Sequence, residues 1–336
     1  MNRIVRAKLV SILFAAVALA APLAAGAQAG LVLETDMVAG SEIPVTYHLV
    51  MTDDGLYTPI GLRKPDGDGP FPIVLFASGN GGEGLPYIKD YSHNRGWTLE
   101  QFVAAGYAVG WLRYRSEVDV PEYGVAPLTA RRGSGRPRYN RAPLEYEDVI
   151  AIIQYVKTLP YVDADRVGYM GMSHGGEMLM KISSVYDGIA AGIASEPASA
   201  AFLARRARDP AAAARPEAPE TAVTSDAARL AAEVEALHGL IDRDVAMARI
   251  APIDIPIFVQ GRDRDHNQGV FRLNYELLVE AGKRAQWKSY DHDVHGFAYV
   301  VRDSDGRYAP DAVQREVVAD SIAFVDAQLK PAASAR

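Results

Sequence analysis

Residues 167–176 read VGYMGMSHGG, a short apolar run that leads into Gly-x-Ser-x-Gly-Gly, and further apolar residues at helical spacing follow. This pattern predicts a strand that turns sharply into a helix, with Ser173 at the bend. Glycines two positions before and after the serine leave room for a strained turn that larger side chains would block. Such a turn lifts the Ser173 hydroxyl clear of the sheet edge. It also leaves the backbone N–H of His174 at a helix N-terminus, where a developing oxyanion is favoured.

Similar apolar runs recur along the chain and alternate with amphipathic stretches. Continuous apolar runs are typical of parallel strands that are buried on both faces of a sheet. The predicted strands are 71–77, 106–112, 166–171, 189–194 and 255–260, and the predicted helices are 144–157, 271–281 and 313–329. The alternation predicts an α/β fold with a doubly wound, mostly parallel sheet.

Three stretches depart from this alternation. Residues 31–63 read as antiparallel strands with a turn at 53–55, which we expect to form one edge of the sheet. Residues 113–143 are rich in Arg, Pro and Gly, and the arginines of 131–141 suit a substrate with a carboxylate or phosphate, although a solvated basic loop is the favoured interpretation. Residues 197–250 are rich in Ala, Arg and Glu and are interpreted as a helical cap inserted between strands. Residues 30–336 are thus expected to form one α/β domain.

Composition excludes several classes of protein. The 336 residues include 35 Lys+Arg and 42 Asp+Glu, with a net charge of −7 and 49% hydrophobic residues, so the chain is neither disordered nor basic enough for a nucleic-acid partner. The absence of Cys excludes a disulfide scaffold, a Cys-ligated metal and a thiol nucleophile.

Residues 1–29 resemble a secretory signal peptide. Arg3, Arg6 and Lys8 precede an apolar run that Pro22 ends, and 27–29 reads Ala-Gln-Ala, a small-x-small cleavage site. The run is short for a bilayer span, and a retained N-terminal anchor is the alternative. We therefore expect an exported protein, periplasmic or extracellular, with no stable membrane insertion after cleavage.

A serine hydroxyl needs a base to accept its proton. His295, in Asp293-Val294-His295-Gly296-Phe297 after the run 286–291, is the predicted base, with His292 as its rival. The predicted acid follows the strand 255–260: Asp265 is favoured over Asp263, and the other aspartate is expected to pair with Arg262 or Arg264 at the surface. Glu196, after the strand 189–194, is the next candidate.

Ser78-Gly79-Asn80-Gly81-Gly82 directly follows the predicted strand 71–77. Glycines here let the backbone approach a ligand and point N–H groups inward. We predict the backbone N–H of Asn80 and that of His174 as the two oxyanion donors. An ordinary flexible turn is the alternative.

These stretches together resemble the α/β-hydrolase superfamily, and most of all dienelactone-hydrolase-like proteins and the catalytic domain of prolyl oligopeptidases. The resemblance implies a Ser–Asp–His triad on Ser173, Asp265 or Asp263, and His295. The chain departs from the family in four respects. Ser78 stands where a histidine is usual, Arg264 stands where the usual acid motif has aspartate, no Cys nucleophile exists, and only about fifty residues precede the hydrolase core, too few for a propeller.

The expected function is hydrolysis of a small-molecule carboxylic ester through an acyl-enzyme on Ser173, with no metal or organic cofactor. Two alternatives remain: an exported peptidase of the prolyl-oligopeptidase type, and a non-catalytic binding protein on the same fold. The oligomeric state is not predicted.

Overall fold

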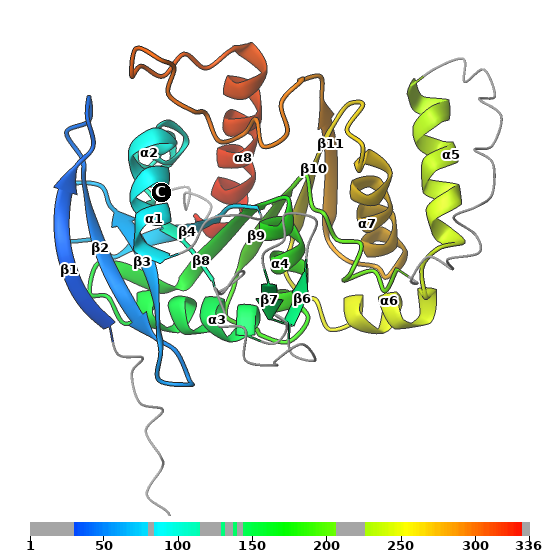
Figure 1. Ribbon diagram of the computed structural model, residues 1–336, viewed down its shortest axis with the longest axis horizontal. Coiled ribbons are helices and arrows are strands. Elements are labelled where there is room, and N and C mark those ends of the chain that lie inside the picture. The colour runs from blue at the N-terminus through cyan, green and yellow to red at the C-terminus, as the bar shows by residue number, and fades with distance from the viewer. Residues whose placement is uncertain are drawn as a thin grey trace, which may run out of the picture.

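A single mixed sheet organises the protein in this computed structural model, which describes residues 30–79, 84–114, 129–131, 137–139, 144–205 and 226–330 (Figure 1). Its strands lie in the order β1-β2-β3-β5-β4-β8-β9-β10-β11. They are β1 (Gly30–Met37), β2 (Pro44–Met51), β3 (Tyr57–Arg63), β4 (Phe71–Ala77), β5 (Ala108–Leu112), β8 (Val162–Met172), β9 (Ala191–Ser195), β10 (Ile257–Arg262) and β11 (Ala285–Tyr290).

The six strands from β5 to β11 in this order are mutually parallel, whereas β1, β2 and β3 are antiparallel and form one edge. A tight turn joins β2 to β3, where Gly55 has a φ of 77° and the Thr52 N–H donates to the Leu56 carbonyl at 2.8 Å. The predicted antiparallel edge and its turn at 53–55 are confirmed.

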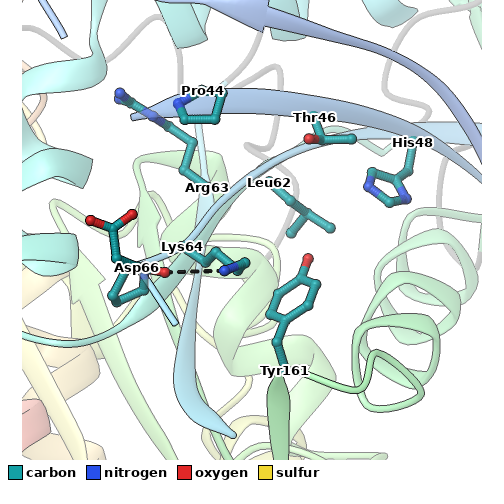
Figure 2. Close-up of a pocket in the computed structure, with 9 residues that line it drawn as sticks. Pro44, Thr46, His48, Leu62, Arg63, Lys64, Asp66 and Tyr161 are labelled. Carbon is teal, nitrogen blue, oxygen red and sulfur yellow. Dashed lines mark hydrogen bonds between the residues drawn. The ribbon is translucent and has the colours of Figure 1, made fainter. Parts of the chain in front are cut away.

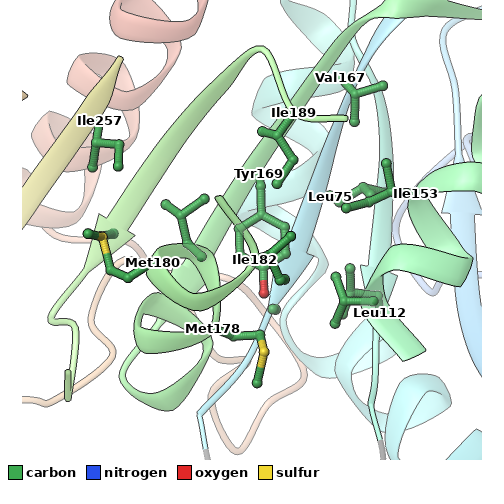
Figure 3. Packing of buried hydrophobic residues seen from close by; sticks show 14 of the residues in the cluster. Leu75, Leu112, Ile153, Val167, Tyr169, Met178, Met180, Ile182, Ile189 and Ile257 are labelled. Carbon is green, nitrogen blue, oxygen red and sulfur yellow. The ribbon is translucent and has the colours of Figure 1, made fainter. Parts of the chain in front are cut away.

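Helices cover both faces of the sheet. On one face lie α1 (Gly84–Asn94), α2 (Gly96–Ala104) and α8 (Ala312–Leu329). The helices that pack into the core of the other face are α3 (Leu144–Val156), α4 (His174–Ser183), α5 (Asp226–His238), α6 (Arg243–Ile250) and α7 (Gln268–Glu280). Figure 3 shows α4 directing Met178 and Ile182 into a cluster that includes Leu75 of β4 and Tyr169 of β8. Burial from both sides explains why β4 and the second half of β8 are continuous apolar runs.

The opposite face holds a group of buried aromatic side chains. Trp111 of β5 packs edge-on against Tyr299, with ring centroids 4.7 Å apart, and Phe76 of β4 lies 5.7 Å from Trp111. Rings in this arrangement add to the apolar area that each buries. The segment after β11 is therefore part of the core and fixed against the centre of the sheet.

The strand order reverses between β4 and β8, because β5 lies on one side of β4 and β9 follows β8 on the other. In open α/β sheets, ligands bind beyond the carboxyl ends of the strands at such a point. Gly79 follows β4 and Ser173 follows β8. The fold therefore brings the glycine-rich segment that begins at Ser78 and the turn at Ser173 together at the carboxyl ends of these two strands.

The predicted α/β class with a mostly parallel sheet is confirmed. Several strands and helices begin or end at residues other than the predicted ones. The strand predicted from residue 106 begins at Ala108, and α7 begins three residues before the predicted 271. The helices α1 and α2 were not predicted from the sequence.

Segment 197–250 contains α5 and α6, with 206–225 outside the described residues. Arg229 of α5 donates to the Gln268 side chain of α7 at 2.8 Å, so α5 packs beside α7 at one end of the sheet (Figure 1). The interpretation of this segment as a helical cap stays a prediction.

Two further predictions fall wholly or partly outside the described residues. The expected signal, 1–29, lies outside them. Of the arginine-rich stretch 131–141, the structure describes the backbone of a two-stranded sheet formed by β6 (Thr129–Arg131) and β7 (Pro137–Tyr139). Within the described part of the chain, every helix is too short or too polar to cross a bilayer.

Candidate functional site

Ser173 lies on a strained turn between β8 and α4. Its φ of 57° and ψ of −116° fall in a region that non-glycine residues rarely adopt. The turn is attached to the neighbouring strand, because the Ser173 N–H donates to the Ser195 carbonyl at 2.9 Å. The Ser173 carbonyl accepts from the Ala198 N–H at 3.0 Å. These bonds hold the unfavourable backbone angles in place.

The glycines around Ser173 are required by close backbone contacts. A Cβ atom at Gly171 would overlap the carbonyl group of Gly175, and one at Gly175 would lie 2.6 Å from the Ala77 carbonyl oxygen. A Cβ at Gly176 would lie 3.0 Å from the Cα of Pro197. The predicted reason for glycine at these positions, absence of space for a side chain, agrees with this geometry.

His295 lies on the loop after β11 and approaches the end of β8. The next residue, Gly296, has a φ of 82°, and a Cβ there would lie 3.0 Å from Cε of Met172, the residue before Ser173. The Tyr299 hydroxyl donates toward the carbonyls of Ala77 and Met170, at 3.2 and 3.0 Å. The loop is thereby attached to the ends of β4 and β8. Within the described residues, no hydrogen bond joins the Ser173 hydroxyl to His295.

Asp265 is the aspartate that meets His295. Its Oδ2 lies 3.0 Å from His295 Nδ1, and its carboxylate is almost fully buried. The Asn267 N–H donates to Oδ1 at 2.7 Å, and Arg262 donates to Oδ2 through Nη2 at 2.6 Å and Nε at 3.0 Å. Asp263 points elsewhere and accepts from the hydroxyl of Ser289 on β11.

The arginine pairing differs from the sequence expectation. The aspartate that does not meet the histidine, Asp263, was expected to pair with Arg262 or Arg264, but Arg262 pairs with Asp265 and Arg264 pairs with Asp291. The physical reason is burial: a carboxylate removed from water needs several donors, and Arg262 supplies two from the end of the adjacent strand.

Hydrogen bonding sets the protonation of the pair. The pKa of His295 is raised to about 9, first by its hydrogen bond to Asp265 and then by the nearby Glu196 carboxylate, against burial, which lowers it. Burial works to raise the pKa of Asp265, but hydrogen bonds from His295, Asn267 and Arg262 outweigh it and hold the pKa well below its usual value. Asp265 is therefore ionised and favours the imidazolium form of His295.

Glu196 is the third acidic member of this group. It directly follows β9, is fully buried, and lies with Oε1 3.2 Å from both His295 Nδ1 and Arg262 Nε. Glu196, Asp265 and His295 are close enough to share a metal ion. The Arg262 guanidinium already supplies a cation to both carboxylates, so the group is better suited to an ion-pair network than to a metal.

The end of β4 also reaches Ser173. A Cβ at Gly79 would lie 3.1 Å from the Ser173 Cβ, so glycine permits this approach. Arg113 donates to the Gly79 carbonyl at 3.0 Å, and Tyr114 donates to the Ser78 carbonyl at 3.2 Å. These two buried residues after β5, which the sequence analysis did not single out, orient the loop. Asn80, the predicted donor, lies outside the described residues.

The His174 side chain is buried between two carboxylates. Nε2 lies 3.0 and 3.1 Å from the two oxygens of Glu145, and Nδ1 lies 3.0 Å from Glu177. Burial raises the pKa of Glu177, but the hydrogen bond to His174 and the Lys181 charge lower it below its usual value. The side chain thus connects α3 to α4, while the backbone N–H of His174 remains at the start of α4.

The rival histidine has a different role. His292 Nε2 lies 3.0 Å from Asp311, the N-cap residue of α8, and its ring stacks on Phe297. It is therefore attached to α8 rather than to the carboxylates beside His295.

A separate cavity of about 270 Å³ lies beside the amino-terminal end of β8, against β2 and the end of β3 (Figure 2). Its lining includes His48 of β2, Lys64 after β3 and Tyr161, which directly precedes β8. Because Tyr161 precedes the strand that Ser173 follows, the full length of β8 separates this cavity from the serine.

One segment of this chain matches the sequence model of a known family. Residues 136–202, which include Ser173 but end before Asp265 and His295, match the sequence model of the prolyl oligopeptidase family. A comparison with curated protein sequences gives no match.

Solved structures show the same fold. The esterase Est22 is 17% identical with a TM-score of 0.56, and the match covers 85% of this chain and 81% of that one. Carboxyl esterase 2 from Tuber melanosporum is 19% identical with a TM-score of 0.56, over 87% and 89% of the chains. Dipeptidyl peptidase 4 from Porphyromonas gingivalis is 17% identical with a TM-score of 0.52, over 85% of this chain but 36% of that one. These likenesses establish the fold.

The crowding around Gly171 yields a prediction about stability. Gly171→Ala is expected to lower the free energy of unfolding by about 3 kcal/mol, because its Cβ would meet rigid backbone. Gly168→Ala, in the same strand, is the matched control: its Cβ would meet the movable tip of Leu329 at 3.0 Å, so the loss should be about 1 kcal/mol. Urea unfolding of both variants measures the difference. Equal losses would contradict the backbone-contact explanation.

Proposed function

This chain has the α/β-hydrolase fold, and we propose that it is a serine hydrolase that cleaves a small-molecule carboxylic ester through an acyl-enzyme on Ser173. One observation carries the proposal. A serine on a strained strand-to-helix turn shares the carboxyl edge of the sheet with a His295 whose Nδ1 is held by the buried Asp265. Activated serine nucleophiles require a base that a third group orients.

The proposed reaction begins when Ser173 Oγ attacks the ester carbonyl carbon and His295 Nε2 accepts the hydroxyl proton. The N–H at His295 Nδ1 donates a hydrogen bond to Asp265 throughout. Its proton stays on the ring, and Asp265 remains ionised. As the tetrahedral intermediate collapses, the C–O bond to the alcohol breaks and His295 returns the proton to the leaving alkoxide. Water then attacks the acyl-enzyme by the same route.

Two backbone N–H groups are proposed to stabilise the negative oxygen of the intermediate. The N–H of His174 lies in the first turn of α4, where the helix dipole adds to the effect. The second is that of Asn80, supported by the approach of its neighbour Gly79 to Ser173. No step in this sequence needs a metal or an organic cofactor.

A peptidase is the second candidate, because the family model matched by 136–202 is that of prolyl oligopeptidases and one structural neighbour is a dipeptidyl peptidase. The ester is preferred since two structural neighbours of similar length are esterases. The same triad serves both reactions.

Export is also part of the proposal. It is supported by the basic, apolar and small-residue pattern of residues 1–29.

Labelling by a fluorophosphonate probe tests the nucleophile. The wild-type protein should be labelled, and Ser173→Ala should lose both the label and at least about 10⁴-fold in kcat on a p-nitrophenyl acyl ester. His295→Ala should lose several orders of magnitude in kcat. Ser184→Ala, on the C-cap of α4, is the matched control and should keep the label. An unlabelled wild-type protein would favour a binding protein on a hydrolase fold.

The two aspartates should respond differently to loss of charge. Asp265→Asn is expected to lower kcat/KM at least about 100-fold, since the amide no longer holds His295 in the required tautomer. Asp263→Asn should change it by less than about 3-fold, because Asp263 faces Ser289 instead. Steady-state kinetics on one ester compares them. Equal, mild effects would show that Asp265 is not the orienting acid.

Parallel assays distinguish the ester from the peptide. Turnover of a p-nitrophenyl acyl ester is expected to be faster than turnover of a dipeptide anilide. The ratio of the two rates should exceed the ratio of the two substrates' intrinsic reactivities, which a control serine esterase calibrates. Faster anilide turnover by the purified chain would reverse the ranking.

A further inference from the structure

Glu196, directly after β9, combines a strained backbone with a buried side chain. Its φ of 47° lies in the left-handed region, which is unfavourable for a non-glycine residue, and its side chain is fully buried. Among the described residues, Oε1 has no hydrogen bond of good geometry. Burial of an incompletely satisfied carboxylate is costly, so the position calls for a functional explanation.

The two oxygens of Glu196 face the His295 loop from one side. Oε2 accepts the Gly296 N–H at 2.7 Å, and Oε1 lies 3.2 Å from His295 Nδ1. Asp265 approaches the same nitrogen, at 3.0 Å. One carboxylate therefore comes from the end of β9 and the other from the end of β10, and both converge on one ring nitrogen.

Charge balance distinguishes the two carboxylates. Arg262 donates twice to Asp265 and lies 3.2 Å from Glu196, so the buried group contains two negative charges and one permanent positive charge. With His295 neutral, the group has a net charge of −1. When His295 takes the serine proton, the group becomes neutral. Glu196 thus provides the charge that the imidazolium balances.

We propose, on the basis of the serine-hydrolase mechanism above, that Glu196 is a positioning residue for His295. It holds the loop through the Gly296 N–H and supplies the second negative charge opposite the imidazolium. The proton remains on His295, and none passes to Glu196. The chain therefore has two carboxylates in the place where one would orient the base.

The pH dependence follows from the charged and titratable groups around His295. Asp265 and Glu196 face its Nδ1, Arg262 pairs with both carboxylates, and His266 lies 3.2 Å from Asp265 with its ring centroid 6.2 Å from that of His295. Only neutral His295 can accept the serine proton, so kcat/KM should rise as the pH passes upward through its pKa of about 9. A carboxylate raises the pKa of a neighbouring imidazole, and removal of one charge should move the rise to lower pH.

Glu196→Gln removes the charge and keeps an oxygen that can accept the Gly296 N–H. The midpoint of the kcat/KM rise should move down by about one pH unit, with kcat at the plateau reduced by about 10-fold and KM nearly unchanged. Glu196→Asp, which keeps the charge, should retain a midpoint nearer to wild type. Glu276→Gln, which removes a charge from the half-buried pair with Arg272, is the matched control and should leave the midpoint in place.

A double-mutant cycle tests whether the carboxylates act together. Asp265→Asn should cost at least about 10-fold more kcat/KM in the Glu196→Gln background than in wild type, because Glu196 no longer faces the ring nitrogen. An unmoved midpoint in Glu196→Gln, together with additive losses, would overturn the proposal.

Two controls keep the test interpretable. Fluorophosphonate labelling of wild type separates this outcome from failure of the serine-hydrolase proposal itself. If Glu196→Gln does not fold, Glu196→Asp decides alone: a midpoint moved down by a full pH unit despite the retained charge would overturn the proposal, and an unmoved midpoint would support it.

Discussion

Close packing of peptide backbone at one bend is the constraint on which the site depends. The turn at Ser173 exists because Gly171 and Gly175 touch without side chains and because Gly175 lies against the end of β4. The adjoining strand contributes the Ser195 carbonyl, which accepts the serine N–H. The unfavourable angles of Ser173 are thus maintained by three neighbouring segments of the central sheet, and the hydroxyl position is a property of the sheet as a whole.

Electrostatics performs the corresponding task for the His295 ring. His295 enters on a loop that the Tyr299 hydroxyl attaches to carbonyls near the ends of β4 and β8, and its ring faces carboxylates that follow β9 and β10. Arg262 compensates part of the negative charge and donates to the carbonyls of His292 and Asp293 in the same loop. Orientation of the ring and its affinity for a proton therefore have one structural origin.

The sequence predicted what local patterns encode. Apolar runs located β4, β8, β9 and β10, and the glycine pattern located the turn at Ser173. Each of these patterns is contained within a few consecutive residues, so it can be recognised without knowledge of the rest of the chain. The partners of Arg262 could not be read in this way. Asp263 and Asp265 are separated by one residue, and Arg264 between them has a φ of 60°, a backbone conformation that the sequence pattern does not reveal. Arg113 and Tyr114 gain their roles only through the β4–β5 pairing, which depends on distant parts of the chain.

The position of β11 at the end of the sheet order has a consequence for how the protein matures. Among the strands that the structure describes, β11 pairs only with β10, and the loop that carries His295 follows it. A nascent chain that has folded only as far as α7 would contain Ser173, Glu196 and Asp265 but not His295. The His295 ring therefore reaches the edge of the sheet that holds Ser173 only once β11 has joined β10, so the addition of one edge strand completes the group of side chains around the serine.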